Sequence, residues 1–218
     1  GVAVGNVLQG VPFHFNDDLR IFYDGTTLFE LLNPYAILCG LVSVAMLLMH
    51  GAALLMLKTE GAIAERARAV GCVAALATTV LFALGGVFLW FGVDGYRFTS
   101  EIVTGGPSNP LGKTVEVAGG VWFQNYASYP WMMIAPVLGL ALPLIVFLFI
   151  RLKKSVPALL GSSLAIFGII STVGLSMFPF ILPSSVDPKS SGLSRMSQPE
   201  TGRPLGLRDC CLRGLDML

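Results

Sequence analysis

Four long apolar stretches dominate this chain of 218 residues, and short polar or turn-rich segments separate them. The stretches cover residues 34–57, 69–93, 131–150 and 156–183, and none of them contains Asp, Glu, Lys or Arg. A helix rises about 1.5 Å per residue, so about 20 apolar residues cross a hydrocarbon core about 30 Å thick. The pattern therefore predicts an all-α, polytopic membrane protein with four transmembrane helices in a bundle.

Composition agrees with a membrane location. Charged residues make up 12% of the chain, against about 25% in an ordinary soluble domain. The formal net charge of +1 argues against the basic surface typical of nucleic-acid binding. Two of the four cysteines fall within apolar stretches and two are adjacent near the C-terminus, which indicates neither a disulfide framework nor a metal site. Because the chain begins at Gly1 without Met or a signal-peptide n-region, we expect a fragment.

Charge in the connecting segments predicts the orientation of the helices. Residues 151–154 contain three basic side chains and no acid, and the turn after the first stretch carries Lys58, Arg66 and Arg68 against two glutamates. The other connections are acidic or of mixed charge. Cytoplasmic loops carry an excess of Lys and Arg, so we expect these two segments in the cytoplasm.

Other residues predict the local anatomy of the bundle. Asn33 and Pro34 are suited to begin the first helix, and Pro143 inside the third stretch predicts a kink. Residues 115–126 favour a short interfacial helix. Abundant small residues favour close helix packing. Seven aromatic residues near the outer ends predict an interfacial belt; these are Trp90, Phe91, Tyr96, Trp122, Tyr126, Tyr129 and Trp131.

Candidate chemistry inside the apolar stretches is sparse. His50 lies deep in the first one, where an ionisable residue suggests a function and could ligate a haem iron. No second His or Met is obviously paired with it, so we interpret His50 as a neutral side chain bonded to a neighbouring helix or near the interface. His14 precedes an acidic segment outside the membrane and is expected to be solvated.

The remaining candidates are weaker. Asp17, Asp18 and Asp24 could attract cations, but a solvated loop is the commoner explanation. Met46, Met49 and Met56 recur at helical spacing, as does the pair at 132–133, and methionine in an apolar helix usually packs. Residues 104–106 lack the lysine and helix start of a phosphate loop. We therefore assign no catalytic, cofactor-binding or metal-binding residue.

Five ordered motifs carry a resemblance to a known family. They are Gly-Asn-Val-Leu-Gln-Gly-Val-Pro-Phe at 5–13, Leu-Leu-Asn-Pro-Tyr-Ala-Ile-Leu-Cys-Gly-Leu-Val-Ser at 31–43, Asp-Gly-Tyr at 94–96, Ser-Asn-Pro-Leu at 108–111 and Met-Phe-Pro-Phe-Ile-Leu-Pro-Ser-Ser at 177–185. Together they closely resemble subunit II of the cytochrome bd quinol oxidases, from about residue 1 to about residue 191.

The resemblance implies a domain organisation. Residues 1–13 would be the end of a preceding transmembrane helix, and residues 14–183 a four-helix membrane bundle with an outer loop at about 94–130. Residues 184–218 would form an extramembrane tail. Within it, residues 192–218 are rich in Arg, Gly and Leu without any aromatic residue, so we expect them to be disordered or frameshifted.

The resemblance also implies a function that belongs to a complex. Such oxidases take electrons from quinol and reduce O2 to water, and subunit I holds haems b and d. This chain is then expected to be a non-catalytic subunit that binds no haem itself and forms a heterodimer with subunit I. Its place would be the bacterial cytoplasmic (inner) membrane, within the aerobic respiratory chain. Membrane lipid, and a structural quinone in the bundle, are further partners left open; nucleic acid is not expected.

Two alternatives belong to other classes. Half of a secondary transporter would also be a bundle of apolar helices, but such carriers place charged or unwound polar segments near the midplane. The four stretches offer no charge there. A purely structural or assembly membrane protein differs from an oxidase subunit only through the motif resemblance.

Overall fold

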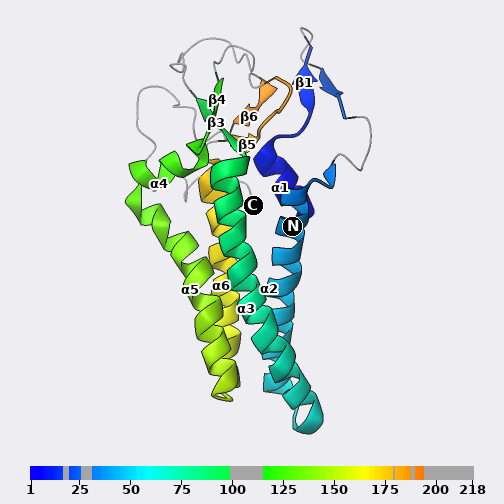
Figure 1. Cartoon of the computed structure of the whole chain (residues 1–218), viewed down its shortest axis with the longest axis vertical. Coiled ribbons are helices and arrows are strands. Elements are labelled where there is room, and N and C mark those ends of the chain that lie inside the picture. Colours follow the sequence, from blue (N-terminus) through cyan, green and yellow to red (C-terminus); the bar gives the residue numbers. More distant parts are fainter. Residues whose placement is uncertain (17–19, 26–30, 99–114, 179, 188–189, 194–218) are drawn as a thin grey trace, which may run out of the picture.

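Four long helices lie side by side in the computed structural model of the chain (Figure 1). The structure describes residues 1–16, 20–25, 31–98, 115–178, 180–187 and 190–193. The long helices are α2 (Pro34–Lys58), α3 (Gly61–Gly92), α5 (Ile134–Arg151) and α6 (Ser155–Met177). All four, with α5 extended back to Pro130, are long and apolar enough to cross a membrane. The predicted all-α bundle of four membrane helices is confirmed.

The helix ends follow from local sequence. The Asn33 side chain accepts a hydrogen bond from the Ala36 N–H at 2.7 Å, and Pro34 occupies the first turn of α2, where its missing N–H costs nothing. Gly61 begins α3 with a φ of +67°, a conformation that favours glycine. The predicted turn at 58–68 is therefore wrong. Helix α3 begins at Gly61, eight residues before the apolar stretch predicted from residue 69, so Arg66 and Arg68 lie within the helix.

The second pair of membrane helices, α5 and α6, differs from the prediction at the end of α6. A short 3-10 helix, η3 (Pro130–Met133), leads into α5, which continues through Pro143. The kink predicted there stays a prediction. Helix α6 ends at Met177, so the predicted stretch to residue 183 is too long. Its last apolar residues form a strand, because prolines at 179 and 183 remove backbone donors that a helix would need.

Short helices and strands cover the end of the bundle opposite the α2–α3 and α5–α6 connections (Figure 1). We call this part of the chain the outer cap. Its helical parts are α1 (Val2–Gln9), η2 (Val121–Phe123) and α4 (Gln124–Ser128). Its strands form three antiparallel pairs: β1 (Phe13–Phe15) with β2 (Ile21–Tyr23), β3 (Asp94–Phe98) with β4 (Val115–Gly119), and β5 (Phe180–Leu182) with β6 (Gly192–Leu193). The interfacial helix predicted at 115–126 is wrong in its first half, where β-branched Val115 and Val117 pair with β3.

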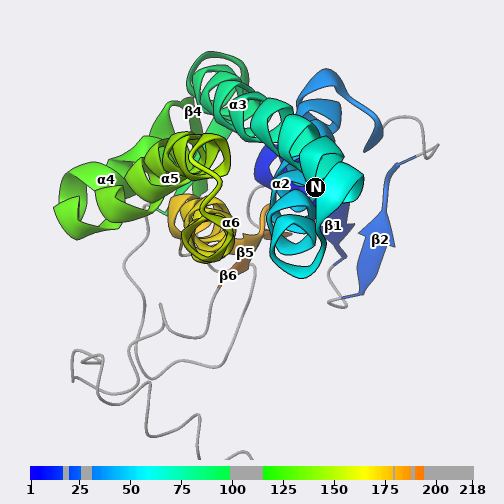
Figure 2. The same ribbon diagram turned by 90° about the horizontal axis from the view of Figure 1, so that it is seen from below.

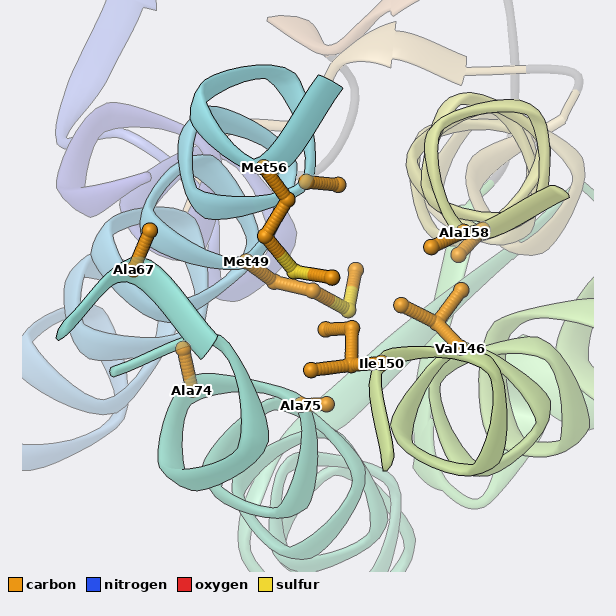
Figure 3. Packing of buried hydrophobic residues seen from close by; sticks show 10 residues of the cluster. Met49, Met56, Ala67, Ala74, Ala75, Val146, Ile150 and Ala158 are labelled. Atoms are coloured by element: carbon orange, nitrogen blue, oxygen red, sulfur yellow. The ribbon is translucent and has the colours of Figure 1, made fainter. Parts of the chain in front are cut away.

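Two apolar cores hold the bundle and the outer cap. Looking along the bundle, α3 lies beside α2 and α5, while α6 lies beside α5 and α2 (Figure 2). Their shared core is made of small and flexible side chains (Figure 3), namely Met49, Ala53, Met56, Ala67, Ala74, Ala75, Val146, Ile150, Ala158 and Ala165. Alanine lets helices approach closely, and methionine fills irregular gaps. A second core joins the bundle to the outer cap and contains Leu8, Tyr35, Leu89, Val93, Tyr96, Trp122, Met177 and Phe180.

Helix α1 packs tightly against the outer half of α2. A Cβ added at Gly5 would lie 2.6 Å from the Ala36 Cα, so only glycine permits this approach. Beside that contact, Asn6 donates to the Leu31 carbonyl at 2.7 Å and accepts from the Asn33 side chain at 2.9 Å. The buried amide of Asn6 is thus satisfied, which fixes α1 to the start of α2.

Candidate functional site

His50 forms the polar contact inside the bundle that the sequence singled out. Its Nδ1 lies 2.9 Å from the Oγ of Ser162 on α6, and that fully buried hydroxyl also lies 2.8 Å from the Leu159 carbonyl. The single hydroxyl proton can donate to the Leu159 carbonyl while the oxygen accepts from the Nδ1–H. The expected hydrogen bond to a neighbouring helix is present.

Among the described residues, His50 does not belong to a cluster of side chains that could hold a metal ion. No group of three or more His, Cys, Asp or Glu close enough to hold an ion occurs among residues 1–16, 20–25, 31–98, 115–178, 180–187 and 190–193. Haem iron can take an axial His. The Nδ1 of His50 faces the Ser162 hydroxyl, and the interpretation of His50 as a structural side chain stays a prediction.

Other hydroxyls inside the bundle are satisfied within their own helices. Thr78 and Thr79 donate to the carbonyls four residues earlier in α3, at 2.8 and 3.1 Å. Thr172 on α6 does the same with the Gly168 carbonyl at 2.7 Å. Each of these bonds uses the single proton of its hydroxyl within the same helix. These three threonines therefore serve their own helices.

The methionines divide between core and surface. Met49 and Met56 belong to the bundle core, where Figure 3 shows their side chains pointing inward, whereas Met46 is half-buried outside that cluster. Met132 is buried and Met133 is exposed. A soft-metal site would need several sulfur atoms to converge. The packing interpretation is confirmed for Met49 and Met56.

His14 and Asp24 contact each other across the β1–β2 hairpin. The Nδ1 of His14 lies 2.6 Å from an Asp24 oxygen, and the imidazole stacks on Phe22 with 5.7 Å between ring centroids. His14 is thus a partly exposed side chain, as expected for a solvated position, and it has a carboxylate partner. Asp17 and Asp18 lie outside the described residues, as do the segments 104–106 and 108–111 and the adjacent cysteines at 210–211.

The seven aromatic residues predicted as a belt separate into two groups. Trp90, Phe91, Tyr129 and Trp131 are exposed at the outer ends of the helices, as a belt requires. The other three are buried within the outer cap, and for them the prediction is wrong; these are Tyr96, Trp122 and Tyr126. Aromatic spacing alone could not reveal this, because both groups occupy the same level of the bundle.

The buried tyrosines pin the outer cap to the helices. The Tyr96 hydroxyl donates to the Gln9 carbonyl at 3.2 Å, and burial together with the Asp94 charge raises the pKa of Tyr96. The Tyr126 hydroxyl lies 2.7 Å from the Ser176 Oγ and 3.1 Å from the Thr172 carbonyl. Burial raises the pKa of Tyr126 despite the opposing effect of the Ser176 hydrogen bond. Both phenols therefore stay neutral at ordinary pH.

Three buried serines tie the segment after α6 to strand β1. The Ser184 hydroxyl donates to the Phe13 carbonyl, and the Ser184 N–H donates to the Ser191 Oγ at 2.9 Å. The Phe15 N–H donates to the Ser190 Oγ at 3.0 Å. The tail predicted from residue 184 thus begins as part of the outer cap, and Gly192 and Leu193 form β6. Residues 194–218 lie outside the described residues.

Comparison with known proteins extends across most of the chain. The profile of the family described as cytochrome bd terminal oxidase subunit II matches residues 1–202, eleven residues beyond the resemblance noted from motifs. A probable cytochrome oxidase subunit 2 of Haemophilus influenzae is 44% identical over 191 residues, which is 88% of this chain and 50% of the relative. The cytochrome bd-I ubiquinol oxidase subunit 2 of Escherichia coli K12 is 45% identical over 185 residues, or 85% and 48%. The chain spans about half the length of these curated relatives.

Proposed function

The chain belongs to the cytochrome bd terminal oxidase subunit II family, and from that premise we propose that it acts as a non-catalytic part of a quinol:O2 oxidoreductase. The observation that carries the proposal is the family match over residues 1–202, together with four helices suited to cross a membrane. In the proposed complex, a subunit I holds haems b and d and oxidises quinol. The heterodimer would lie in the bacterial cytoplasmic membrane and serve aerobic respiration.

The apolar interior of the bundle favours a structural role for this chain in the proposed complex. Over residues 34–57, 69–92, 134–150 and 155–177 of the described helices, His50 is the only side chain of an acidic or basic type, and its imidazole lies within hydrogen-bond distance of Ser162. A charge in such an interior is costly, so the bundle opposes ion leakage across it. We propose that this part of the chain insulates and packs against its partner, and that electrons and protons move elsewhere in the complex.

The alternative of half a secondary transporter is not favoured. Transporters build midplane sites from interrupted helices with exposed backbone groups. Helices α2, α3, α5 and α6 run without interruption over 25, 32, 18 and 23 residues. The family match points the same way.

A visible spectrum tests the proposed function. The chain would be expressed with a cognate subunit I, within a subunit of the length of the curated relatives. An affinity tag on the subunit that contains this chain would capture the complex. We expect haem b and haem d bands to co-purify with the tagged subunit in constant ratio. A colourless preparation in which both subunits are present would contradict the proposal, and a tagged unrelated four-span membrane protein gives the background.

Thiol labelling tests the proposed orientation, with the Arg151–Lys154 turn in the cytoplasm. In a background with the four native cysteines replaced, Ser155→Cys should resist a membrane-impermeant maleimide in intact cells and react after lysis. Val186→Cys, an exposed position in the outer cap, should react in intact cells once an outer membrane is permeabilised. The reverse pattern would overturn the orientation, because the basic turn is its strongest signal.

A further inference from the structure

Arg68 and Arg151 lie at the same level of the seam between α3 and α5. A Cβ at Gly71 would lie 3.0 Å from the Ile150 Cδ1, so these two helices touch directly at that point. Figure 3 shows Ile150 reaching from α5 toward Ala75 of α3. Arg68 precedes Gly71 by one helical turn in the direction of the basic end, and Arg151 directly follows Ile150. The positions of Arg68 and Arg151 therefore lie near one level of the α3–α5 seam, at the edge of the membrane-spanning part.

Arg68 is unusually enclosed for a residue with so few partners. Its side chain is 22% exposed, and its Nη1 lies 2.6 Å from an oxygen of Glu65, which is itself 65% exposed. The Nε is buried and has no hydrogen-bond partner in the part of the chain that the structure describes. A guanidinium offers five N–H donors, and an exposed carboxylate in the i,i+3 position stabilises it only weakly. Arg68 can accept a further anionic partner.

Arg151 adds a second cation without a carboxylate. Its guanidinium carbon lies 4.9 Å from the centroid of the Phe147 ring, which holds the charge against α5. No ion pair to Arg151 occurs among the described residues. Lys153 and Lys154 follow and are exposed. Over residues 58–68 and 151–154 there are six basic and two acidic side chains, so this end of the bundle has a positive field.

Apolar surface continues from the two arginines into the membrane. Leu76 lies about two turns further along α3, and Leu144 lies about two turns back along α5. Both are exposed on helices that are long and apolar enough to cross a membrane. A ligand held by the arginines would thus have its polar part at the interface and an apolar part alongside these leucines.

We propose that the basic end of the α3–α5 seam binds an anionic phospholipid, with its phosphate accepting hydrogen bonds from Arg68 and Arg151. Paired guanidinium groups recognise phosphate oxygens well. Basic pockets between transmembrane helices on the cytoplasmic side bind anionic head groups. The neighbouring leucines favour a lipid over free phosphate, because only a lipid buries apolar surface there.

Native mass spectrometry of the detergent-solubilised complex tests the site, with phosphatidylglycerol and phosphatidylcholine of identical acyl chains as probes. We expect the wild-type complex to prefer phosphatidylglycerol by about 30-fold, which corresponds to two basic side chains at about 1 kcal/mol each. The double variant R68Q/R151Q should lose that preference. The double variant R68K/R151K, which keeps the charge but not the planar fork, should retain part of it.

Arg66→Gln is the matched control, because Arg66 is an exposed residue of the same helical turn on a different face of α3. It should leave the preference unchanged. An equal loss in R66Q and in R68Q/R151Q would show a diffuse charge effect and overturn the proposal. So would an absence of preference in the wild type, or displacement of the lipid by equimolar inorganic phosphate. Retained haem bands in each variant exclude misassembly as the cause.

Discussion

The membrane bundle and the outer cap of this chain are held together by different kinds of contact. In the bundle, hydroxyls of Thr78 and Thr172 bond carbonyls of their own helices, and the core between helices is mostly alanine with two methionines. In the outer cap, side chains bond backbone groups that are far away in sequence: Tyr96 reaches Gln9 and Ser184 reaches Phe13. Local bonding dominates one region and long-range bonding the other.

This difference follows from the two solvents. Lipid offers no hydrogen bonds, so each membrane helix satisfies its backbone internally and helices associate through close packing. The outer cap stands beyond the spans, where large aromatic side chains can bury apolar area and a polar end can find a partner. Substitutions should therefore destabilise the outer cap through lost area and lost long-range bonds, and the bundle through changes of volume.

Trp122→Ala in the outer cap should have the largest effect. Trp122 is 2% exposed and packs against Tyr96 and Phe180 with ring centroids 5.8 and 6.4 Å away. Truncation of a buried aromatic residue costs about 3–5 kcal/mol, from lost transfer energy and from the cavity. Thermal unfolding of the detergent-solubilised complex, followed by circular dichroism, should show a clear fall in Tm.

Trp131→Ala provides the comparison for that substitution. Trp131 is 58% exposed at the outer end of α5, where a lipid interface would surround it. Its loss should shift Tm much less in detergent. Equal shifts for the two tryptophans would show that Trp122 is not a core residue of the outer cap.

Gly71→Leu should have an intermediate effect by overpacking the bundle. A Cβ at this position would already lie 3.0 Å from both the Ala52 Cβ and the Ile150 Cδ1, and inserted volume in a packed core costs about 1–3 kcal/mol. Gly85→Leu, in the same helix with nothing within 4 Å of an added Cβ, is the control. We expect a lower Tm for Gly71→Leu and an unchanged Tm for Gly85→Leu. Equal Tm values for the two variants would contradict the view that close packing at small residues holds the bundle together.

Sequence reasoning succeeded where contacts are local. The apolar stretch at 34–57 predicted α2 to within one residue, because hydropathy and the Asn-Pro start both act within one segment. The strand at Phe180–Leu182 was missed, because hydropathy cannot separate a membrane helix from an apolar strand that buries Phe180 against Trp122. Its partner β6 begins ten residues later, and no local signal announces that pairing.

The same limit applies to the candidate site. His50 was conspicuous as a histidine within an apolar stretch, but its partner Ser162 is 112 residues away. Only the packing of α2 on α6 brings the two together. Likewise, the aromatic residues near the outer ends were identified correctly as a group, yet the division into buried and exposed members depends on the course of β3, β4 and η2.

Ser162→Ala should destabilise the contact between α2 and α6 by a smaller amount. It leaves the His50 Nδ1 without its partner in a half-buried position, which costs about 1–3 kcal/mol for a fully buried group and less here. His50→Gln, which keeps a polar side chain, should preserve the haem spectrum of the assembled complex. Loss of one haem band with normal assembly would show that His50 is a ligand.

Tyr126→Phe should have the smallest effect, and its size should depend on pH. The substitution removes the hydroxyl that bonds Ser176 and the Thr172 carbonyl but keeps the ring, so the cost near neutral pH is about 1 kcal/mol.

Burial raises the pKa of Tyr126 in the folded chain, whereas the unfolded phenol ionises near pH 10. The stabilising contribution is therefore complete below about pH 10 and is lost as pH rises above it, because the unfolded state then releases the proton that the folded state keeps. The Tm of the wild type should fall toward that of Tyr126→Phe in alkaline buffer. Tyr129→Phe, at an exposed position three residues away, should match the wild type at every pH, and a Tm gap for Tyr126→Phe that stays constant to pH 11 would contradict the burial of this hydroxyl.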